Sequence, residues 1–305
     1  MNSYEDELIA KVAWYYYIEE LTQQSISEKL NISRMKVIKY LDLAKKNGVI
    51  QFTIERNRKE QLLLENRLCS CYGLNNAYII PSPKEGSMLN DMLAQAAAAY
   101  LIDRISENTF INMGYGETPS KVLNHLATIA TTPLSIVSLT GGVSYYLPNT
   151  VSNIFKAKLY LYPTPLLLSG SELCQAILKE PEVAAINRMI QLSSLTIVGI
   201  GAMNEDATII SNGILNKTDF TCLSMQGAVG DILTHFIDKD GNPIRTSLND
   251  RLVSTPLETL RTLKNVIGIA GGSHKVDVIR SALRGGYLNE LITDEETAVA
   301  LCEVP

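Results

Sequence analysis

The chain has 305 residues, of which 46% are hydrophobic and 19% are charged, and its formal net charge at pH 7 is −5. This length suits about two domains, and the composition is typical of a globular protein and excludes a disordered or fibrous one. No run of about 18 apolar residues is present, so we expect no membrane span. The five cysteines lack the paired spacing of zinc ligands, so we expect no metal site, and we also expect no cofactor.

The first 55 residues are expected to fold mainly as short helices. They begin with the acidic stretch Met1–Glu7, which lacks the apolar core of a signal peptide, so we expect a cytoplasmic protein. Trp14 and the tyrosines at 15–17 are expected to build the core of this region rather than a surface on which bases stack. A short β-prone run, Val49–Ile54, follows the helices.

Two helices separated by a tight turn are predicted between residues 21 and 41. Thr22 can cap the first helix and Ser33 the second, and Asn31 between them tolerates a left-handed backbone. Val37 and Leu41 would face inward, which leaves basic side chains outside. This order is typical of a helix-turn-helix, whose second helix enters the major groove of double-stranded DNA. The candidate DNA contacts are Thr22, Gln23, Ser33, Arg34, Met35, Lys36 and Lys39.

Positive charge is concentrated in this part of the chain. Residues 33–59 contain eight basic and two acidic residues, so the rest of the chain carries a net charge of −11. A basic block inside an acidic protein suits contact with phosphates, and Val49–Ile54 with Arg56 and Arg58 would form a small wing. A solvated basic face and an ordinary helical hairpin are the alternatives that the pattern leaves open.

A charged segment with embedded leucines separates the two regions. Leu62, Leu63, Leu64 and Leu68 lie in it, which indicates a linker helix that could pair with a second subunit. We therefore expect three parts: a DNA-binding domain at 1–56, a linker helix at 57–72, and a larger third domain at 73–305.

Short apolar runs alternate with helical stretches through the third part. Several runs are apolar throughout, as strands covered on both faces should be. The alternation predicts a Rossmann-like α/β fold with a mostly parallel sheet. The predicted strands are 77–80, 109–113, 134–139, 158–162, 195–200, 266–270 and 290–293.

A glycine-containing turn follows the second of these strands. The turn Gly114-Tyr115-Gly116-Glu117-Thr118 precedes Pro119, and Thr118 with Pro119 marks the start of a helix. Glycines at a helix N-terminus let backbone N–H groups approach a phosphate. The third glycine and the acidic residue of a dinucleotide fingerprint are missing, and a plain tight turn is the alternative.

Further glycine turns follow other strands, at Thr140-Gly141-Gly142, Gly199-Ile200-Gly201 and Gly271-Gly272. Ligands of open parallel sheets lie outside the carboxyl ends of the strands, so the turns indicate a shared pocket. Lys275, after the last turn, could reach an anionic ligand, although a solvated lysine is the alternative. Asp231, in a segment expected to open a helix, either stabilises the helix dipole or accepts hydrogen bonds from substrate hydroxyls.

Catalytic motifs are absent from the sequence. His125 and His235 are expected within helices, and His274 lies beside a glycine turn. We therefore expect a protein that is not an enzyme. The alternative is an enzyme that would use Glu117, Asp231 or His274 as its base.

From residue 11 to residue 301 the chain resembles the SorC family of sugar-responsive transcription regulators, especially the LsrR-type repressors of autoinducer-2 uptake. The resemblance rests on the segments Ala13–Tyr17, Leu21–Gln23 with the helix-turn-helix, Gly114–Glu117, Leu139–Val143, Ile197–Ala202, Asp206–Ile210, Gly227–Leu233 and Gly285–Tyr287. It implies that residues 73–305 form a sugar-phosphate effector-binding and oligomerisation domain, related to glucosamine-6-phosphate deaminase and ribose-phosphate isomerase but used as a sensor. A sugar-phosphate isomerase or deaminase with an accessory N-terminal domain is the alternative. It also implies a homotetramer built as a dimer of dimers, and a repressor whose operator binding is loosened by a phosphorylated sugar or a phospho-autoinducer-2-like effector.

The resemblance also implies roles for individual residues. The turn from Gly114 to Thr118 and Lys275 would clamp the phosphate, Asp231 and Leu233 would contact the body of the effector, and the 140–142 turn would line the same pocket. The sequence departs from relatives at Ile38-Lys39, where Ser-Arg is common, and around 163–165 and 169–171, so the operator and the effector stay open. The candidate effector contacts are Gly114, Tyr115, Gly116, Glu117, Thr118, Thr140, Gly141, Gly142, Asp231, Leu233 and Lys275.

Overall fold

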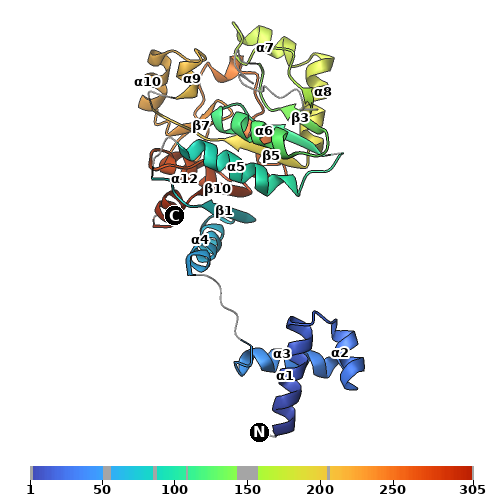
Figure 1. Cartoon of the computed structure of the whole chain (residues 1–305). Coiled ribbons are helices and arrows are strands. Elements are labelled where there is room, and N and C mark those ends of the chain that lie inside the picture. Colours follow the sequence, from blue (N-terminus) through green and yellow to red (C-terminus); the bar gives the residue numbers. More distant parts are fainter. Residues whose placement is uncertain are drawn as a thin grey trace. The chain divides into compact units, whose positions relative to one another are not determined.

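The computed structural model describes residues 3–50, 56–84, 88–107, 109–142, 157–204 and 207–303. The chain divides into two units, Met1–Lys59 and Glu60–Pro305 (Figure 1). The first is helical, and the second is an α/β unit built on a parallel sheet. Each unit has its own hydrophobic core.

Three helices pack around a small core in the first unit. They are α1 (Ser3–Tyr17), α2 (Gln23–Leu30) and α3 (Arg34–Lys46). Val12 from α1, Ile26 from α2 and Val37 from α3 are fully buried against one another. Because inward positions recur every three or four residues on each helix, the opposite faces are left to polar and charged side chains.

The predicted caps of α2 and α3 are confirmed. Thr22 accepts a hydrogen bond from the backbone N–H of Ser25, and Ser33 accepts one from that of Lys36. Asn31 has φ 51° and ψ 46°, the left-handed conformation expected from the sequence. Each side chain satisfies a backbone donor that a helix N-terminus leaves free, so the two helices meet at a fixed turn.

The prediction for Trp14 is wrong. Its side chain is 56% exposed, and its Nε1 donates a hydrogen bond to Glu19 Oε1 at 3.2 Å. The tyrosines at 15–17 are half-buried against the core, as expected. Trp14 lies one residue beyond the buried Ala13, so the helical period turns it outward. The predicted wing at Val49–Ile54 lies largely outside the described residues.

Helix α4 (Arg56–Tyr72) covers the edge of the sheet in the second unit. Gln61 donates to the backbone carbonyl of Ile79, and Glu65 accepts from the N–H of Ile79 at 3.0 Å. Leu68 is fully buried, while Leu62 and Leu63 are exposed. The side chains of α4 thus satisfy the backbone of an edge strand that would otherwise be open to pairing.

The second unit is built on a seven-stranded sheet whose neighbouring strands are all parallel. Its order is β1-β10-β9-β5-β2-β3-β4. All seven strands occur where the sequence predicts them. The strands are β1 (Asn76–Ile80), β2 (Phe110–Met113), β3 (Leu134–Ser138), β4 (Ala157–Tyr160), β5 (Leu195–Gly199), β9 (Val266–Ile269) and β10 (Glu290–Asp294).

Helices cover both faces of this sheet. Neighbouring strand residues such as Ile197 and Val198 are buried in different core clusters, because successive side chains of a strand point to opposite faces. One face packs against α5 (Leu89–Ile102) and α6 (Glu117–Ile129), which lie side by side in Figure 1. The other packs against α8 (Pro181–Leu192), α12 (Val276–Arg284) and α13 (Glu295–Glu303). This double cover explains the continuously apolar strands.

A small antiparallel sheet lies beyond the main one. It consists of β6 (Gly201–Ala202), β7 (Gly230–Ile232) and β8 (His235–Ile237). Asp231 is on β7 and His235 on β8, so the predictions that placed both in helices are wrong. The remaining elements are α7 (Ser171–Ile177), α9 (Thr208–Ser211), α10 (Lys217–Met225), α11 (Leu257–Leu260) and the 3-10 helices Asn249–Arg251 and Ser273–Lys275.

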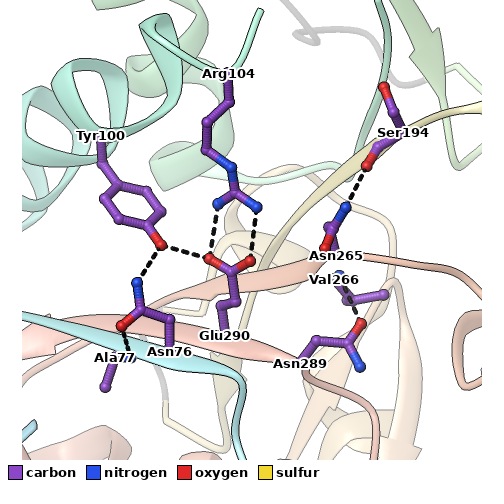
Figure 2. A network of polar contacts seen from close by, with 9 residues as sticks. All are labelled: Asn76, Ala77, Tyr100, Arg104, Ser194, Asn265, Val266, Asn289 and Glu290. Carbon is purple, nitrogen blue, oxygen red and sulfur yellow. Dashed lines mark hydrogen bonds and ion pairs between the residues drawn. The ribbon is translucent and has the colours of Figure 1, made fainter. Parts of the chain in front are cut away.

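A polar network joins the amino ends of the strands (Figure 2). Glu290, at the start of β10, is 4% exposed and accepts hydrogen bonds from both terminal nitrogens of Arg104, at 2.7 and 2.8 Å. Tyr100 donates to the same carboxylate at 2.6 Å and accepts from Asn76 on β1. Because each buried polar group has a partner, the network fixes the carboxyl end of α5 against the sheet.

Candidate functional site

A cavity of about 480 Å³ opens at the carboxyl ends of the parallel strands, where ligands of such sheets bind. Its walls come from the turn between β2 and α6, the β5–β6 segment, the β7–β8 hairpin, α9 and the 3-10 helix Ser273–Lys275. The lining residues are Asn90, Tyr115, Gly116, Glu117, Thr118, Pro119, Gly199, Ile200, Gly201, Ala202, Asn204, Ala207, Thr208, Ile209, Asp231, Leu233, Thr234, His274 and Lys275.

The N-terminus of α6 faces this cavity without a side-chain cap. The helix begins at Glu117 with Gly116 at the cap position, which corrects the prediction that Thr118 caps it. Gly116 has φ 135°, a conformation that side chains strongly disfavour. The first N–H groups of a helix lack partners within the helix, and the helix dipole places partial positive charge there. This end of the cavity is therefore suited to an anion.

Lys275 brings a cation into the same cavity. Its side chain is half-buried, and its ammonium has no carboxylate within ion-pair distance among the described residues. Burial lowers the pKa of Lys275, and the carboxylates of Glu117 and Asp231 partly offset this effect. A buried ammonium without a close counter-ion is costly to the fold, so an anionic ligand would be favoured beside it.

The turn that carries Lys275 is held by Asp294 at the end of β10. Asp294 Oδ1 accepts hydrogen bonds from the Gly272 N–H at 2.9 Å and from Thr297 Oγ1 at 2.6 Å, and Oδ2 accepts one from Ser82 at 2.7 Å. Burial opposes ionisation, but these donors outweigh it and keep the pKa of Asp294 below its usual value. Asp294 thus fixes the backbone from which Lys275 projects.

Asp231 supplies a carboxylate from the β7–β8 hairpin. Its Oδ2 accepts a hydrogen bond from the Thr234 N–H at 3.0 Å. Burial raises the pKa of Asp231 to about 6, although the Thr234 hydrogen bond and the charge of Lys275 act in the opposite direction. A Cβ at Gly201 would overlap Asp231 Oδ1, so the glycine makes room for the carboxylate. This group can accept hydrogen bonds from the hydroxyls of a ligand.

The hairpin turn itself is strained. Leu233 and Thr234 have φ of 53° and 68°, in a region that residues other than glycine rarely adopt. A two-residue hairpin turn requires such angles, and Gly or Asn usually supplies them. Strain of this kind persists where the surroundings hold it and is often found at ligand sites. Here it places Leu233 in the cavity wall next to Asp231.

Tyr115 and Asn212 connect two walls of the cavity. The side-chain amide of Asn212, just after α9, donates a hydrogen bond to the Tyr115 hydroxyl. Burial raises the pKa of Tyr115, so this hydroxyl stays neutral near pH 7. The contact fixes α9 beside the turn that precedes α6.

The cavity brings together most of the candidate effector contacts. Gly114 lies behind the lining, where a Cβ would press on Leu233. The 140–142 turn is not among the described lining residues: Thr140 pairs with Ser254, and Gly142 pairs with Pro165. The candidates that line the cavity are Tyr115, Gly116, Glu117, Thr118, Asp231, Leu233 and Lys275.

Several lining residues were not predicted as contacts. Asn90 comes from the start of α5, and Asn204 and Thr208 come from the segment between β6 and α9. These side chains offer amide and hydroxyl groups to a ligand. In the sequence, this wall was signalled by the glycines at 199 and 201 and by the segment Asp206–Ile210 of the family resemblance. His274 also lines the cavity, and burial together with the charge of Lys275 lowers its pKa, which favours the neutral ring.

The candidate DNA contacts form an exposed face of the first unit. Arg34, Lys36 and Lys39 are exposed on α3, and Met35 is 73% exposed. Thr22 and Ser33, the two caps, are also exposed. Gln23 is half-buried, and together with Thr22 and Arg34 it lines a shallow hollow between the starts of α2 and α3. The side chains therefore have the access that a groove-binding helix needs.

Other kinds of site find no support among the described residues. No group of three or more metal-binding side chains occurs there. In the same residues, no helix is long and apolar enough to cross a membrane.

The comparisons with known proteins agree on one class. Residues 56–303 match the family of sugar-binding domains. The chain is 32% identical over 301 residues to the transcriptional regulator LsrR of Klebsiella pneumoniae subsp. pneumoniae, covering 97% of this chain and 93% of that protein. It is 31% identical to LsrR of Escherichia coli (strain K12), with 97% and 95% covered.

Solved structures show the same architecture. The full-length sorbitol operon regulator SorC from Klebsiella pneumoniae is 26% identical, with a TM-score of 0.70 over 99% of this chain and 100% of that chain. A sugar-binding domain of a transcriptional repressor from Vibrio fischeri, 23% identical, has a TM-score of 0.72 over 80% and 98% and supports the fold alone. The relatives named here are regulators of transcription and not enzymes.

Proposed function

Because the chain belongs to the SorC- and LsrR-type family of sugar-binding transcriptional regulators, we propose that it is a repressor of transcription. Its target would be an operon for the utilisation of a carbohydrate or of autoinducer-2. A phosphorylated sugar-like effector would control its binding to DNA. In this proposal α3 binds operator DNA, and the cavity at the carboxyl ends of the strands binds the effector. Effector binding loosens operator binding.

One observation carries the effector half of the proposal: the half-buried Lys275 lines the same cavity as the N-terminus of α6, which has no side-chain cap. Helix N-termini and lysines are recurrent phosphate ligands, and both act best where water is excluded. Asp231, Asn204 and Thr208 supply acceptors and donors for the hydroxyls of a sugar-like body. The combination suits a small polyol with one anionic end.

The DNA half rests on the cap-turn-cap geometry of α2 and α3 and on the exposed cations of α3. Arg34 and Lys36 lie in the first turn of α3, where a recognition helix contacts base edges and phosphates. Lys39 follows one turn later on the same exposed side. Symmetric operators require paired subunits, and we propose a homotetramer, a dimer of dimers, as the working form.

The decisive experiment measures binding of the full-length protein to the DNA upstream of its own gene. Fructose 6-phosphate, ribulose 5-phosphate and phosphorylated autoinducer-2 are titrated into the complex. We expect at least one of them to weaken operator binding. Arg34→Ala should weaken operator binding and leave ligand binding intact, whereas Asp231→Ala should produce a repressor that no longer responds. If each variant lost both functions equally while remaining folded, the division of labour would be wrong.

A further inference from the structure

The cavity contains an unequal set of charges. Among the described lining residues, Lys275 is the only side chain that is cationic near pH 7, because His274 has a lowered pKa. Two carboxylates, Glu117 and Asp231, lie in the same lining. The cationic features are therefore Lys275 and the N-terminus of α6, and the rest of the cavity is neutral or acidic.

The two carboxylates differ in how far they are neutralised. Glu117 is exposed, forms an ion pair with Lys121 at 3.0 Å and accepts a hydrogen bond from Asn90 at 3.1 Å. Asp231 is half-buried, and among the described residues it accepts a hydrogen bond from the Thr234 N–H, a neutral donor. Asp231 is therefore the carboxylate whose charge a ligand inside the cavity would meet with little screening by solvent.

We propose that the cavity selects monophosphorylated ligands over bisphosphorylated ones, and that Asp231 determines this selectivity. The inference rests on the proposed function and adds the class of effector. One phosphate is satisfied by Lys275 and the N–H groups of α6. A second phosphate, at the other end of a sugar of five or six carbons, would find no cation among the described lining residues and would face the carboxylate of Asp231. A hydroxyl at that position would instead donate a hydrogen bond to it.

The test compares ligands that differ by one phosphate. Binding of fructose 6-phosphate and fructose 1,6-bisphosphate, and of ribulose 5-phosphate and ribulose 1,5-bisphosphate, is measured by titration calorimetry on the full-length protein. We expect the monophosphate of whichever pair binds to be at least about 10-fold tighter, a difference of about 1.4 kcal/mol. A bisphosphate that binds as tightly as its monophosphate, or more tightly, would overturn the selectivity and leave the proposed function standing.

Variants assign the selectivity to Asp231. Asp231→Asn keeps the shape and the acceptor for Thr234 but removes the charge, so the ratio of the two affinities should fall to within about threefold. Asp91→Asn makes the same charge change on α5, outside the lining, and should leave the ratio unchanged. An unchanged ratio in Asp231→Asn, with thermal unfolding like that of the parent, would overturn the role of Asp231. If no sugar phosphate of either kind bound, the proposed function itself would fall, and the inference with it.

Discussion

Replacing Lys275 by methionine separates a binding role from a structural one. The substitution keeps most of the apolar stem and removes the ammonium, which lies in the cavity without a close carboxylate among the described residues. Burial lowers the pKa of Lys275, so the folded state disfavours the charged form. Removing the charge should therefore leave the unfolding temperature of the ligand-free protein unchanged or raise it.

Ligand affinity should change in the opposite direction. A hydrogen bond between charged groups contributes about 1.5–3 kcal/mol, which corresponds to a loss of about 10- to 150-fold in affinity for a sugar phosphate. Inorganic phosphate, used as a probe that carries no sugar, should raise the unfolding temperature of the parent protein more than that of Lys275→Met, because a ligand that binds only the folded state stabilises it.

Calorimetry and thermal unfolding, each with and without ligand, provide the measurement. Lys239→Met is the matched control, because Lys239 is exposed, pairs with Asp240, and neither residue is in the cavity lining. Its ligand affinity should stay within about threefold of the parent. Unchanged ligand affinity in Lys275→Met, or a ligand-free protein destabilised by several degrees, would refute the assignment of Lys275 as an anion-binding group.

Three further predictions concern DNA binding, pH and the fold. Arg34→Ala should reduce operator affinity in gel-shift assays and reduce the steepness of log affinity against log salt concentration by about 1. Lys11 pairs with Glu7 on α1, and Lys11→Ala should change neither quantity. The same salt dependence in both variants would contradict this. Because the pKa of Asp231 is about 6, its carboxylate becomes protonated as the pH falls from 7.5 to about 5. The difference in ligand affinity between the parent and Asp231→Asn should therefore shrink over this range. A constant difference would count against a contact between the ligand and this carboxylate. Glu290→Gln should cost about 2–3 kcal/mol in urea unfolding at pH 7, below the ~3–5 kcal/mol of fully buried pairs because Arg104 is partly exposed. The pKa of Glu290 is held below 4.5, so this stability is present above that pH and lost as the pH falls through the folded value; a variant cost that stayed constant down to acid pH would contradict the sign.

The sequence was sufficient to predict those structural features that depend only on residues close together in the chain. The caps Thr22 and Ser33 act on backbone groups three residues away, and Asn31 sets the turn by its own conformation. The central strands could be predicted because both of their faces are buried, which makes their runs largely apolar, whereas the edge strands β1 and β4 keep exposed residues. These elements need no knowledge of distant contacts.

The sequence was insufficient to predict features that contacts between distant residues impose against the local sequence pattern. Asp231 follows glycines that resemble the start of a helix, but the segment forms a hairpin whose turn is made by Leu233 and Thr234 at positive φ. Neither residue signals such a turn, because the conformation is imposed by the surrounding structure. Asn90 and Thr208 are similar cases, since only the order of strands in the sheet brings their elements to one cavity.

The central claim, that one site controls the other, is tested most directly by linkage. Operator affinity of the full-length protein is measured by fluorescence anisotropy with and without a saturating sugar phosphate, and ligand affinity is measured with and without operator. The account predicts that the ligand weakens operator binding and that the operator weakens ligand binding by the same factor. A ligand that occupies the cavity and leaves operator affinity unchanged would contradict it.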